Sequence, residues 1–434
     1  MNSRRFPGAI AVVGGGPVAL AAAVGFAKAL PEASIEWVPA MVSDAALADR
    51  WPLVLPSAQA MLARLDCPPE LLLRHGVATP RLATRFLGWG PGSSPWMVGD
   101  EPAPGPPGVA LHQLWLRAET ERPYHALNPV CVAGEAGQLA GNMQPALHCK
   151  ARALSQGLAS LARQSRVIMG QSPLTGVARG RDGVEALQLA DGRELAVDFV
   201  IDATGPDRLV ATSDGFNGWD DALPCRFLWI EPDAAAPSLV DTYQAVEGGW
   251  TARWPGAKAT ALVQGGGIPI ATGRLDAPLR GNVLALGEAA VQPGPLGLTG
   301  FTLALAGLSL ALDLLPVGGD TALLAAEYNR RVGQRADRMR DFLAAHQIGL
   351  ASGADAVIPP SLATTLAQFT RRGTLTPVDE DSVERDAWIA VLIGQGLRPQ
   401  RPDPIALGLS RDDARRLVAN YNGQARAAAG KRGA

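Results

Sequence analysis

The stretch that decides the fold lies near the N-terminus and reads AIAVVGGGPVA, residues 9–19. It opens with a short apolar run of the kind found in buried strands. Three glycines follow, which permit a tight turn, and the Ala-rich residues 18–30 predict a helix. Residues 34–38 predict a second strand. The order of strand, glycine turn, helix and strand predicts the first βαβ unit of a dinucleotide-binding fold.

The turn has the chemistry to hold a pyrophosphate. Its pattern is GxGxxA, with Gly14, Gly16 and Ala19 at the three defining positions. Glycines let a ligand approach the backbone, and the free N–H groups at the start of the helix favour an anion. A ribose-binding carboxylate is expected at the end of the second strand, but there the chain runs from Glu36 into Pro39. The ribose contact is therefore in question, and a tight turn without a ligand is the alternative.

Two later segments also read as buried strands that end in small residues. The first, FVIDATG, ends in Asp202 and Gly205, and the second, NVLALGEAA, contains Gly287 and Glu288. They resemble the later nucleotide-proximal segments of two-domain FAD enzymes, where an acidic side chain contacts the ribityl and pyrophosphate region of the flavin. Either segment alone could be an ordinary strand that ends in a turn. Three such segments in this order predict an FAD-binding fold.

The length of 434 residues suggests two or three structural units. We expect an α/β fold with a Rossmann-like FAD-binding domain, an interleaved substrate domain and a mostly helical C-terminal region. The FAD-binding domain lies within residues 1–350 and is assembled from segments at about 8–60, 146–210 and 280–320. The substrate side is made by segments at about 61–145 and 211–279. The helical region covers residues 351–434, and residues 146–164 predict a single helix.

Composition excludes several classes of protein. Hydrophobic residues make up 47% of the chain and charged residues 18%, which excludes a disordered chain. The net charge of −2 gives no reason to expect a nucleic-acid partner. Four cysteines without a CxxC pair and five scattered histidines predict no metal site. So few cysteines in a long chain indicate reduced, cytoplasmic thiols.

Two apolar stretches could be mistaken for membrane or export signals. Residues 301–315 contain Asp313 and are too short to span a bilayer, so no membrane partner is expected. Arg4 and Arg5 precede an uncharged stretch, as in an export signal. The glycine turn interrupts that stretch, and a dinucleotide fold explains the same residues. We therefore expect a cytoplasmic protein, with export as the alternative.

Beyond Glu288 the sequence resembles the flavin-dependent tryptophan halogenases. Residues 295–300 read PLGLTG, similar to the PLESTG of that family. Further matching signposts are Leu223-Pro224-Cys225, Gly249-Trp250, Trp254-Pro255, Tyr328-Asn329, residues 340–346 (RDFLAAH), and Trp388 with Gly394-Gln395-Gly396 and Pro399. The likeness covers nearly the whole chain. It implies an FAD cofactor supplied in reduced form by a separate flavin reductase, a small aromatic substrate, and halide as a further candidate partner.

The resemblance also implies functional residues. In the family, reduced flavin reacts with oxygen to give a hydroperoxide, halide attacks it, and a lysine positions the resulting oxidant beside the substrate. The matching cofactor contacts here are Pro295, Gly297, Thr299 and Gly300. Arg81 stands at the position of the lysine, in the stretch ATPR ahead of RFLGW. An arginine can hydrogen-bond an anion or oxidant, but it is a poor amine for a covalent chloramine.

Other markers of halogenation are missing together. Gly297 replaces the family's glutamate and Leu298 its serine, and no aromatic pair follows His346. Only four of the 39 basic residues are lysines, and none lies near the lysine position: Lys28, Lys150, Lys258 and Lys431.

Three functions remain open. The first is an FAD-dependent oxidoreductase or monooxygenase of this family that is not a conventional tryptophan halogenase, with Arg81 as an anion or oxidant contact. The second is a degenerate, non-catalytic homologue that acts as a partner or binding protein, suggested by Ala19, Pro39, Glu288 and Gly297. The third is an atypical halogenase that uses Arg81. A salt-bridged, structural arginine is the alternative role for Arg81.

Overall fold

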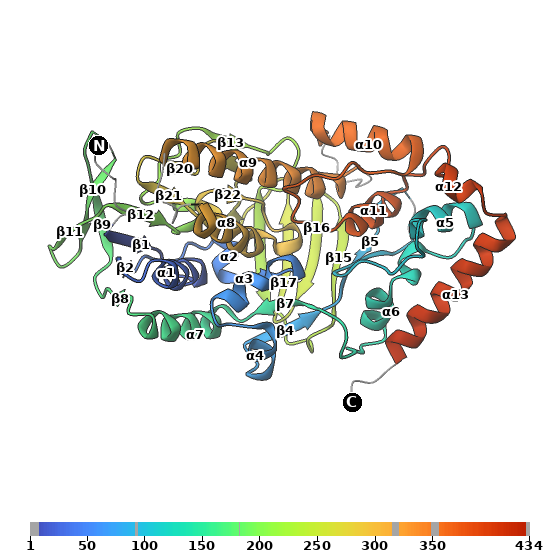
Figure 1. The fold of residues 1–434 in the computed structure, drawn as a ribbon, viewed down its shortest axis with the longest axis horizontal. Coiled ribbons are helices and arrows are strands. Elements are labelled where there is room, and N and C mark those ends of the chain that lie inside the picture. Colours follow the sequence, from blue (N-terminus) through green and yellow to red (C-terminus); the bar gives the residue numbers. More distant parts are fainter. Residues whose placement is uncertain (1–7, 92–93, 182, 315–320, 349–355, 431–434) are drawn as a thin grey trace. The chain divides into compact units, whose positions relative to one another are not determined.

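The computed structural model describes residues 8–91, 94–181, 183–314, 321–348 and 356–430 (Figure 1). The chain folds into two compact units and passes between them repeatedly. Unit 1 is made of residues 1–79, 147–220 and 268–338. Unit 2 is made of residues 80–146, 221–267 and 339–434. Arg4, Arg5 and Lys431 lie outside the described residues, so the structure says nothing about the export alternative.

The main sheet of unit 1 has the strand order β20-β21-β12-β1-β2-β8. Its centre is β1 (Ala9–Val13), which pairs in parallel with β2 (Ser34–Val38) and β12 (Phe199–Asp202). β12 pairs in parallel with β21 (Val283–Ala285), and β2 with β8 (Ile168–Met169). The edge strand β20 (Leu279–Arg280) is antiparallel.

The register of this sheet brings the three predicted segments together. Val13 lies opposite Asp202, and Asp202 lies opposite Ala285, so β1, β12 and β21 end side by side. Ligands of open α/β sheets bind at these carboxyl ends of the strands. The predicted α/β fold with a dinucleotide-binding sheet is confirmed.

Apolar helices cover this sheet. α1 (Pro17–Ala29) is buried over most of its length and packs against α7 (Ala151–Gln164) and α8 (Gly300–Leu314). A Cβ on Gly25 would lie 3.0 Å from a methyl of Leu312, so glycine permits a close approach of α1 to α8. By length and composition, residues 296–314 could cross a membrane, but 78% of that window is buried inside the structure.

Smaller elements complete unit 1. They are α2 (Leu47–Arg50), β3 (Leu53–Val54), η1 (Pro56–Ala58), α3 (Gln59–Arg64), α4 (Pro69–Arg74), β9 (Leu174–Arg179), β10 (Val184–Leu189), β11 (Glu194–Ala196), η3 (Gly205–Asp207), β13 (Phe216–Gly218), β19 (Gly273–Leu275), η4 (Gly287–Ala289), β22 (Val291–Gln292) and η5 (Leu296–Leu298). The chain crosses between the units within β4 (Ala78–Arg81), at the start of β7 (Ala146–Cys149), between Asp220 and Asp221, at the start of β18 (Ile268–Pro269) and within α9 (Thr321–Ala345).

A sheet of unit 2 contains, in spatial order, β14 (Phe227–Pro232), β17 (Ala257–Leu262), β16 (Gly249–Trp254), β15 (Val240–Val246), β5 (Ala83–Leu87) and β6 (Trp96–Gly99). These strands pair antiparallel, except β15 with β5. The helical elements of unit 2 are α5 (Leu111–Ala118), η2 (Tyr124–Leu127), α6 (Pro129–Glu135), α10 (Pro360–Arg372), α11 (Arg385–Gly394), α12 (Pro404–Leu407) and α13 (Arg411–Gly430).

The division into units differs from the predicted domains. Residues 61–79, 211–220 and 268–279 belong to unit 1, and β19 pairs there with β13 and β22. Residues 339–434 belong to unit 2 and form no separate region, because α13 packs along α5 and α6. The single helix predicted over residues 146–164 is also wrong at its start. Residues 146–149 form β7 instead, since they pair with β3, about a hundred residues earlier in the chain.

Candidate functional site

The glycine turn is built by close contacts that exclude larger side chains. Gly14 has a φ of +154°, and a Cβ there would lie 2.5 Å from the carbonyl oxygen of Ala203. The same Cβ would lie 2.7 Å from the methyl of Ala19. A methyl at position 19 is therefore accommodated because Gly14 has no side chain.

The short helix α2, which the sequence did not predict, lies over the start of α1. Asp49, in α2, accepts a hydrogen bond from the backbone N–H of Val18 at 2.9 Å. A side chain on Gly16 would overlap the Asp49 carboxylate. Asp49 is 5% exposed, and burial raises its pKa to about 7, although the Val18 hydrogen bond lowers it. An acidic residue within the mostly apolar stretch AALADRW was the available sequence signal.

Glu288 joins the third predicted segment to the same place. Its Oε2 accepts a hydrogen bond from the backbone N–H of Ala48 at 2.8 Å. Burial raises the pKa of Glu288 to about 8, the Ala48 hydrogen bond lowers it, and the charge of Asp49 raises it further. Gly287, with a φ of +65°, lies against Val18. The predicted residues of the first and third segments therefore meet around α2.

The PLGLTG segment holds a buried hydroxyl without a partner. Gly297 has a φ of +73°, and Leu298 has a φ of +52°, a conformation that favours glycine. Thr299 is 4% exposed, and its Oγ1 has no hydrogen-bond partner among the described residues. Pro295 precedes η5, and Gly300 begins α8 beside Ala48. Buried polar atoms are normally hydrogen-bonded, so the hydroxyl of Thr299 fits a segment that binds a ligand.

Asp202, at the end of β12, is held by hydrogen bonds within its own loop. Its two carboxylate oxygens accept hydrogen bonds from the backbone and hydroxyl of Thr204 and from the backbone N–H groups of Val210 and Ala211. The fully buried side chain therefore closes its own loop. Gly205, at a φ of +71°, lies against Ala46. A cofactor contact by Asp202 stays a prediction.

A cavity of about 330 Å³ opens beside the glycine turn. It is lined by Gly15, Gly16, Pro17, Val42, Asp49, Arg50, Trp51, Ala151, Arg152 and Ser155. Arg50 and Arg152 place positive charge on its wall. Glu36 instead pairs with Arg193 at 2.6 Å. The lining residues of the cavity fit the phosphates of a dinucleotide, while the carboxylate of Glu36 is engaged by Arg193.

In unit 2, Arg81 lies in a buried cluster of charges. It is 3% exposed and donates hydrogen bonds to both oxygens of Asp100, at 2.7 and 2.9 Å, and to Asp241 at 3.1 Å. Burial alone would lower the pKa of Arg81, but the two carboxylates outweigh burial and raise it. This geometry matches the structural alternative, a salt-bridged arginine.

Aromatic side chains fill the neighbouring interior of unit 2. Phe86 stacks on Trp96 at 4.2 Å between ring centroids and on Tyr243 at 5.5 Å. Further members of this cluster are Trp89, Trp250, Trp254, Phe342, His346 and Trp388. Burial lowers the pKa of His346 to about 4, so its ring is neutral at pH 7. The neutral ring donates from Nδ1 to the carbonyl of Phe342 at 2.9 Å.

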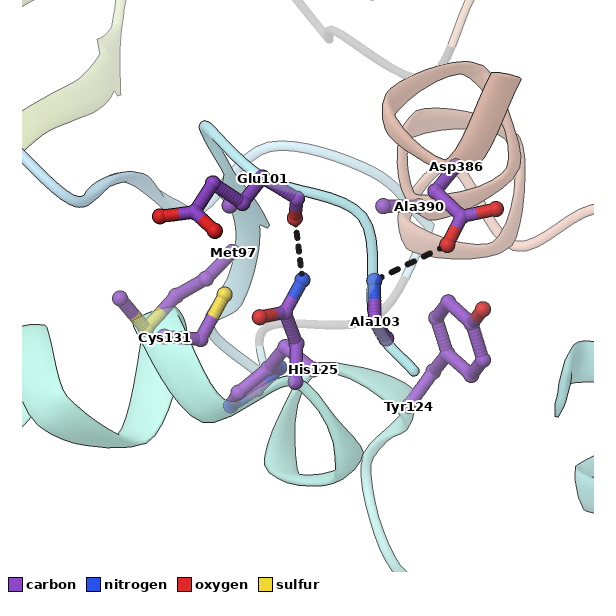
Figure 2. Close-up of a pocket in the computed structure, with 10 residues that line it drawn as sticks. Met97, Glu101, Ala103, Tyr124, His125, Cys131, Asp386 and Ala390 are labelled. Atoms are coloured by element: carbon purple, nitrogen blue, oxygen red, sulfur yellow. Dashed lines mark hydrogen bonds between the residues drawn. The ribbon is translucent and has the colours of Figure 1, made fainter. Parts of the chain in front are cut away.

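Two cavities lie beyond this cluster. The first, of about 730 Å³, is lined by Trp96, Trp115 and Tyr124 and by Arg122 and Arg398, among others. Figure 2 shows the second, of only about 10 Å³, with Glu101, Asp386 and Tyr124 around it. There Asp386 accepts a hydrogen bond from Ala103 at 3.0 Å and holds the adjacent loop. The second cavity has room for about one water molecule, and only the first can admit an organic molecule.

Candidate metal ligands occur among the side chains of the described residues, but they do not gather into a metal site. There, no group of three or more histidine, cysteine, aspartate or glutamate side chains could hold a metal ion.

Comparisons with known proteins agree on one family. A sequence model of the tryptophan halogenase family matches residues 9–260 and 252–411, which is most of the chain. A comparison with curated protein sequences finds no significant match.

Several solved structures share the fold. The flavin-dependent halogenase BrvH from Brevundimonas sp. BAL3 is 20% identical with a TM-score of 0.89, over 99% of this chain and 98% of that chain. A flavin-dependent halogenase from Xanthomonas campestris is 19% identical with a TM-score of 0.87, over 98% and 96%. A tryptophan 6-halogenase from Streptomyces toxytricini is 19% identical with a TM-score of 0.86, over 98% and 97%. At these identities the structures establish a common fold, while the sequence model establishes membership. The chain therefore belongs to the tryptophan halogenase family.

Proposed function

We propose that this chain is an FAD-dependent oxidoreductase of its family that does not work as a conventional tryptophan halogenase. The cofactor of the family is FAD, supplied in reduced form by a separate flavin reductase. Bound reduced FAD supplies the electrons that activate molecular oxygen. Unit 1 is the part of the chain that would hold it.

The residues of unit 1 fit this cofactor. Gly15, Gly16 and Pro17 line the cavity beside the start of α1, and the free backbone N–H groups of a helix start favour an anion. Arg50 and Arg152 line the adjoining cavity and would neutralise phosphate charge. The unpartnered hydroxyl of Thr299, next to Gly300, supports a ligand contact at the start of α8.

The observation that carries the departure from halogenation is the pairing of Arg81. A residue that captures an oxidant needs a donor or amine directed at the substrate. Arg81 instead directs its guanidinium at Asp100 and Asp241. Gly297, at the position of the family's glutamate, has no side chain that could assist halogenation, which supports the same conclusion. We therefore assign Arg81 a structural role and leave halide out of the reaction that we propose.

An aromatic small molecule is the substrate class that we propose. The cavity of about 730 Å³ in unit 2 is lined by Trp96, Trp115 and Tyr124, and by Arg122 and Arg398, a mixture of aromatic and cationic side chains that suits an aromatic molecule with an acidic group. The four cysteines are free, which supports a cytoplasmic location.

The test is a titration of the purified protein with oxidised and with reduced FAD, followed by rapid mixing with oxygen. We expect saturable binding in both states and a phase of flavin oxidation that free FAD does not show. Failure to bind FAD in either state would overturn the proposal. Bromide-dependent product formation that Arg81→Ala abolishes while its Tm stays at the wild-type value would favour the atypical halogenase instead.

A non-catalytic homologue is the second candidate, and the position of Asp49 favours it. This carboxylate already accepts the hydrogen bond of one backbone N–H group at the start of α1, that of Val18. The second candidate predicts FAD binding that leaves the reaction of reduced flavin with oxygen unchanged, and co-purification with an active member of the family.

A further inference from the structure

One acidic side chain, Asp49, lines the cavity where an anionic cofactor would bind, and a second, Glu288, lies close to it. Asp49 caps the N–H of Val18 in the glycine turn and lines the cavity beside Gly15 and Gly16. Glu288 holds the same short helix through the N–H of Ala48. Both side chains are almost fully buried, at 5% and 3% exposure. An ionised carboxylate at this point would repel a pyrophosphate.

Among the described residues, no cationic side chain lowers the pKa of either acid. Charged groups on the neighbouring elements are Arg50 in α2, Arg152 in α7 and Arg208 after η3. Arg50 pairs with Asp44 at 2.7 Å, and Arg208 donates to the carbonyl of Ala289 at 2.8 Å. Within the described residues, neither Asp49 nor Glu288 forms an ion pair with an arginine or lysine. Buried acids without a counterion favour their neutral, protonated form.

We propose that Asp49 and Glu288 are a proton-linked pair that sets how tightly the glycine turn holds FAD, so that cofactor binding takes up a proton. This inference rests on the proposed function, because it requires FAD to bind in unit 1. Asp49 is the positioning residue at the turn. Glu288, which accepts a hydrogen bond from the neighbouring Ala48, acts on the protonation of Asp49 through its charge. When Asp49 is protonated, its carbonyl oxygen still accepts from Val18 while the repulsion of the phosphates disappears.

The sign of the effect follows from the pKa values. Asp49 titrates at about 7 and Glu288 at about 8 without cofactor. Approach of an anion favours the protonated form and raises both further. Above these values a proton must therefore be taken up on binding, and the Kd for FAD rises with pH, by up to about tenfold per unit for one proton.

The experiment measures the Kd for oxidised FAD by calorimetry between pH 6 and 9 at constant ionic strength. Repeating it in two buffers of different ionisation enthalpy counts the protons that are taken up. We expect wild type to bind at least about tenfold more weakly at pH 9 than at pH 6. Asp49→Asn keeps the acceptor for Val18, and we expect its Kd to stay nearly constant. Glu288→Gln should move the midpoint of the profile to lower pH.

Glu36→Gln is the matched control, because Glu36 is a buried acid of unit 1 that pairs with Arg193. Its pH profile should match that of wild type. A wild-type Kd that does not change with pH, or an Asp49→Asn profile like that of wild type, would overturn the inference while leaving the FAD function intact. No FAD binding by any variant at any pH would instead overturn the proposed function.

A second measurement does not depend on the cofactor. A carboxyl whose pKa is raised by folding contributes stability at low pH that is lost as the pH rises through its folded value. Asp49→Asn should therefore raise Tm relative to wild type more at pH 9 than at pH 6. An equal difference at both values would contradict titration of Asp49 in this range.

Discussion

At the residue scale, the contacts of Arg81 in the structure differ from the catalytic role that the sequence resemblance implies. The sequence resemblance predicts that it takes the position of the lysine that positions the oxidant in the family. By geometry it neutralises two carboxylates, Asp100 and Asp241, inside unit 2. An arginine fork suits this task because it can bond two acceptors at once, whereas the compact charge of lysine cannot match both.

Removing this guanidinium should destabilise the fold. Arg81→Ala removes the guanidinium that pairs with two buried carboxylates, and breaking a buried ion pair by removing one partner costs about 3–5 kcal/mol. We expect Tm to fall by more than about 5 °C in a thermal scan. Arg85→Ala is the control, because Arg85 forms a partly exposed pair with Glu135, worth about 0–1 kcal/mol. If Arg81→Ala keeps the wild-type Tm and loses only activity, Arg81 is catalytic after all.

At the element scale, the strand–turn–helix at the start of unit 1 depends on the lack of side chains. β1 and β12 end so close together that the turn runs against the carbonyl of Ala203. Asp202 then closes the next loop with hydrogen bonds to its own chain. The turn and the loop together fix the carboxyl ends of the central strands.

A methyl group in this turn should be costly. Gly14→Ala would bring its Cβ to 2.5 Å from Ala203 and force alanine into a φ of +154°. We expect a loss of about 1–3 kcal/mol from the backbone strain alone, measured by urea unfolding, together with loss of FAD binding. Gly157→Ala is the control, because Gly157 lies in α7 with nothing within 4 Å of the added methyl. It should gain about 0.5–1 kcal/mol. Equal stability of the two variants would contradict this account of the turn.

At the scale of the whole molecule, both units hold buried free thiols. Cys67 and Cys149 lie in unit 1, and Cys131 and Cys225 in unit 2. Burial raises the pKa of all four thiols above that of an ordinary cysteine. The thiolate is the reactive form, so the folded protein should react slowly.

This predicts a simple chemical result. Ellman's reagent should label fewer than about one thiol quickly in the folded protein, and all four after denaturation. Reducing agent should leave Tm unchanged, because no disulfide contributes to stability. A Tm that falls with reductant would show that cysteines pair in solution and would count against the cytoplasmic location.

The sequence alone determined the strand–turn–helix at residues 9–30, the order of the three nucleotide-proximal segments and the family, because these signals are local or lie in short motifs. Only the tertiary structure decided which groups meet. Asp49 reaches Val18 across 31 residues, Glu288 reaches Ala48 across 240, and Arg81 reaches Asp241 across 160. The same is true of β7, which looked helical, and of the C-terminal helices, which joined unit 2. Local propensity acts over a few neighbouring residues, whereas these contacts depend on how distant segments pack and on which buried charges find a partner.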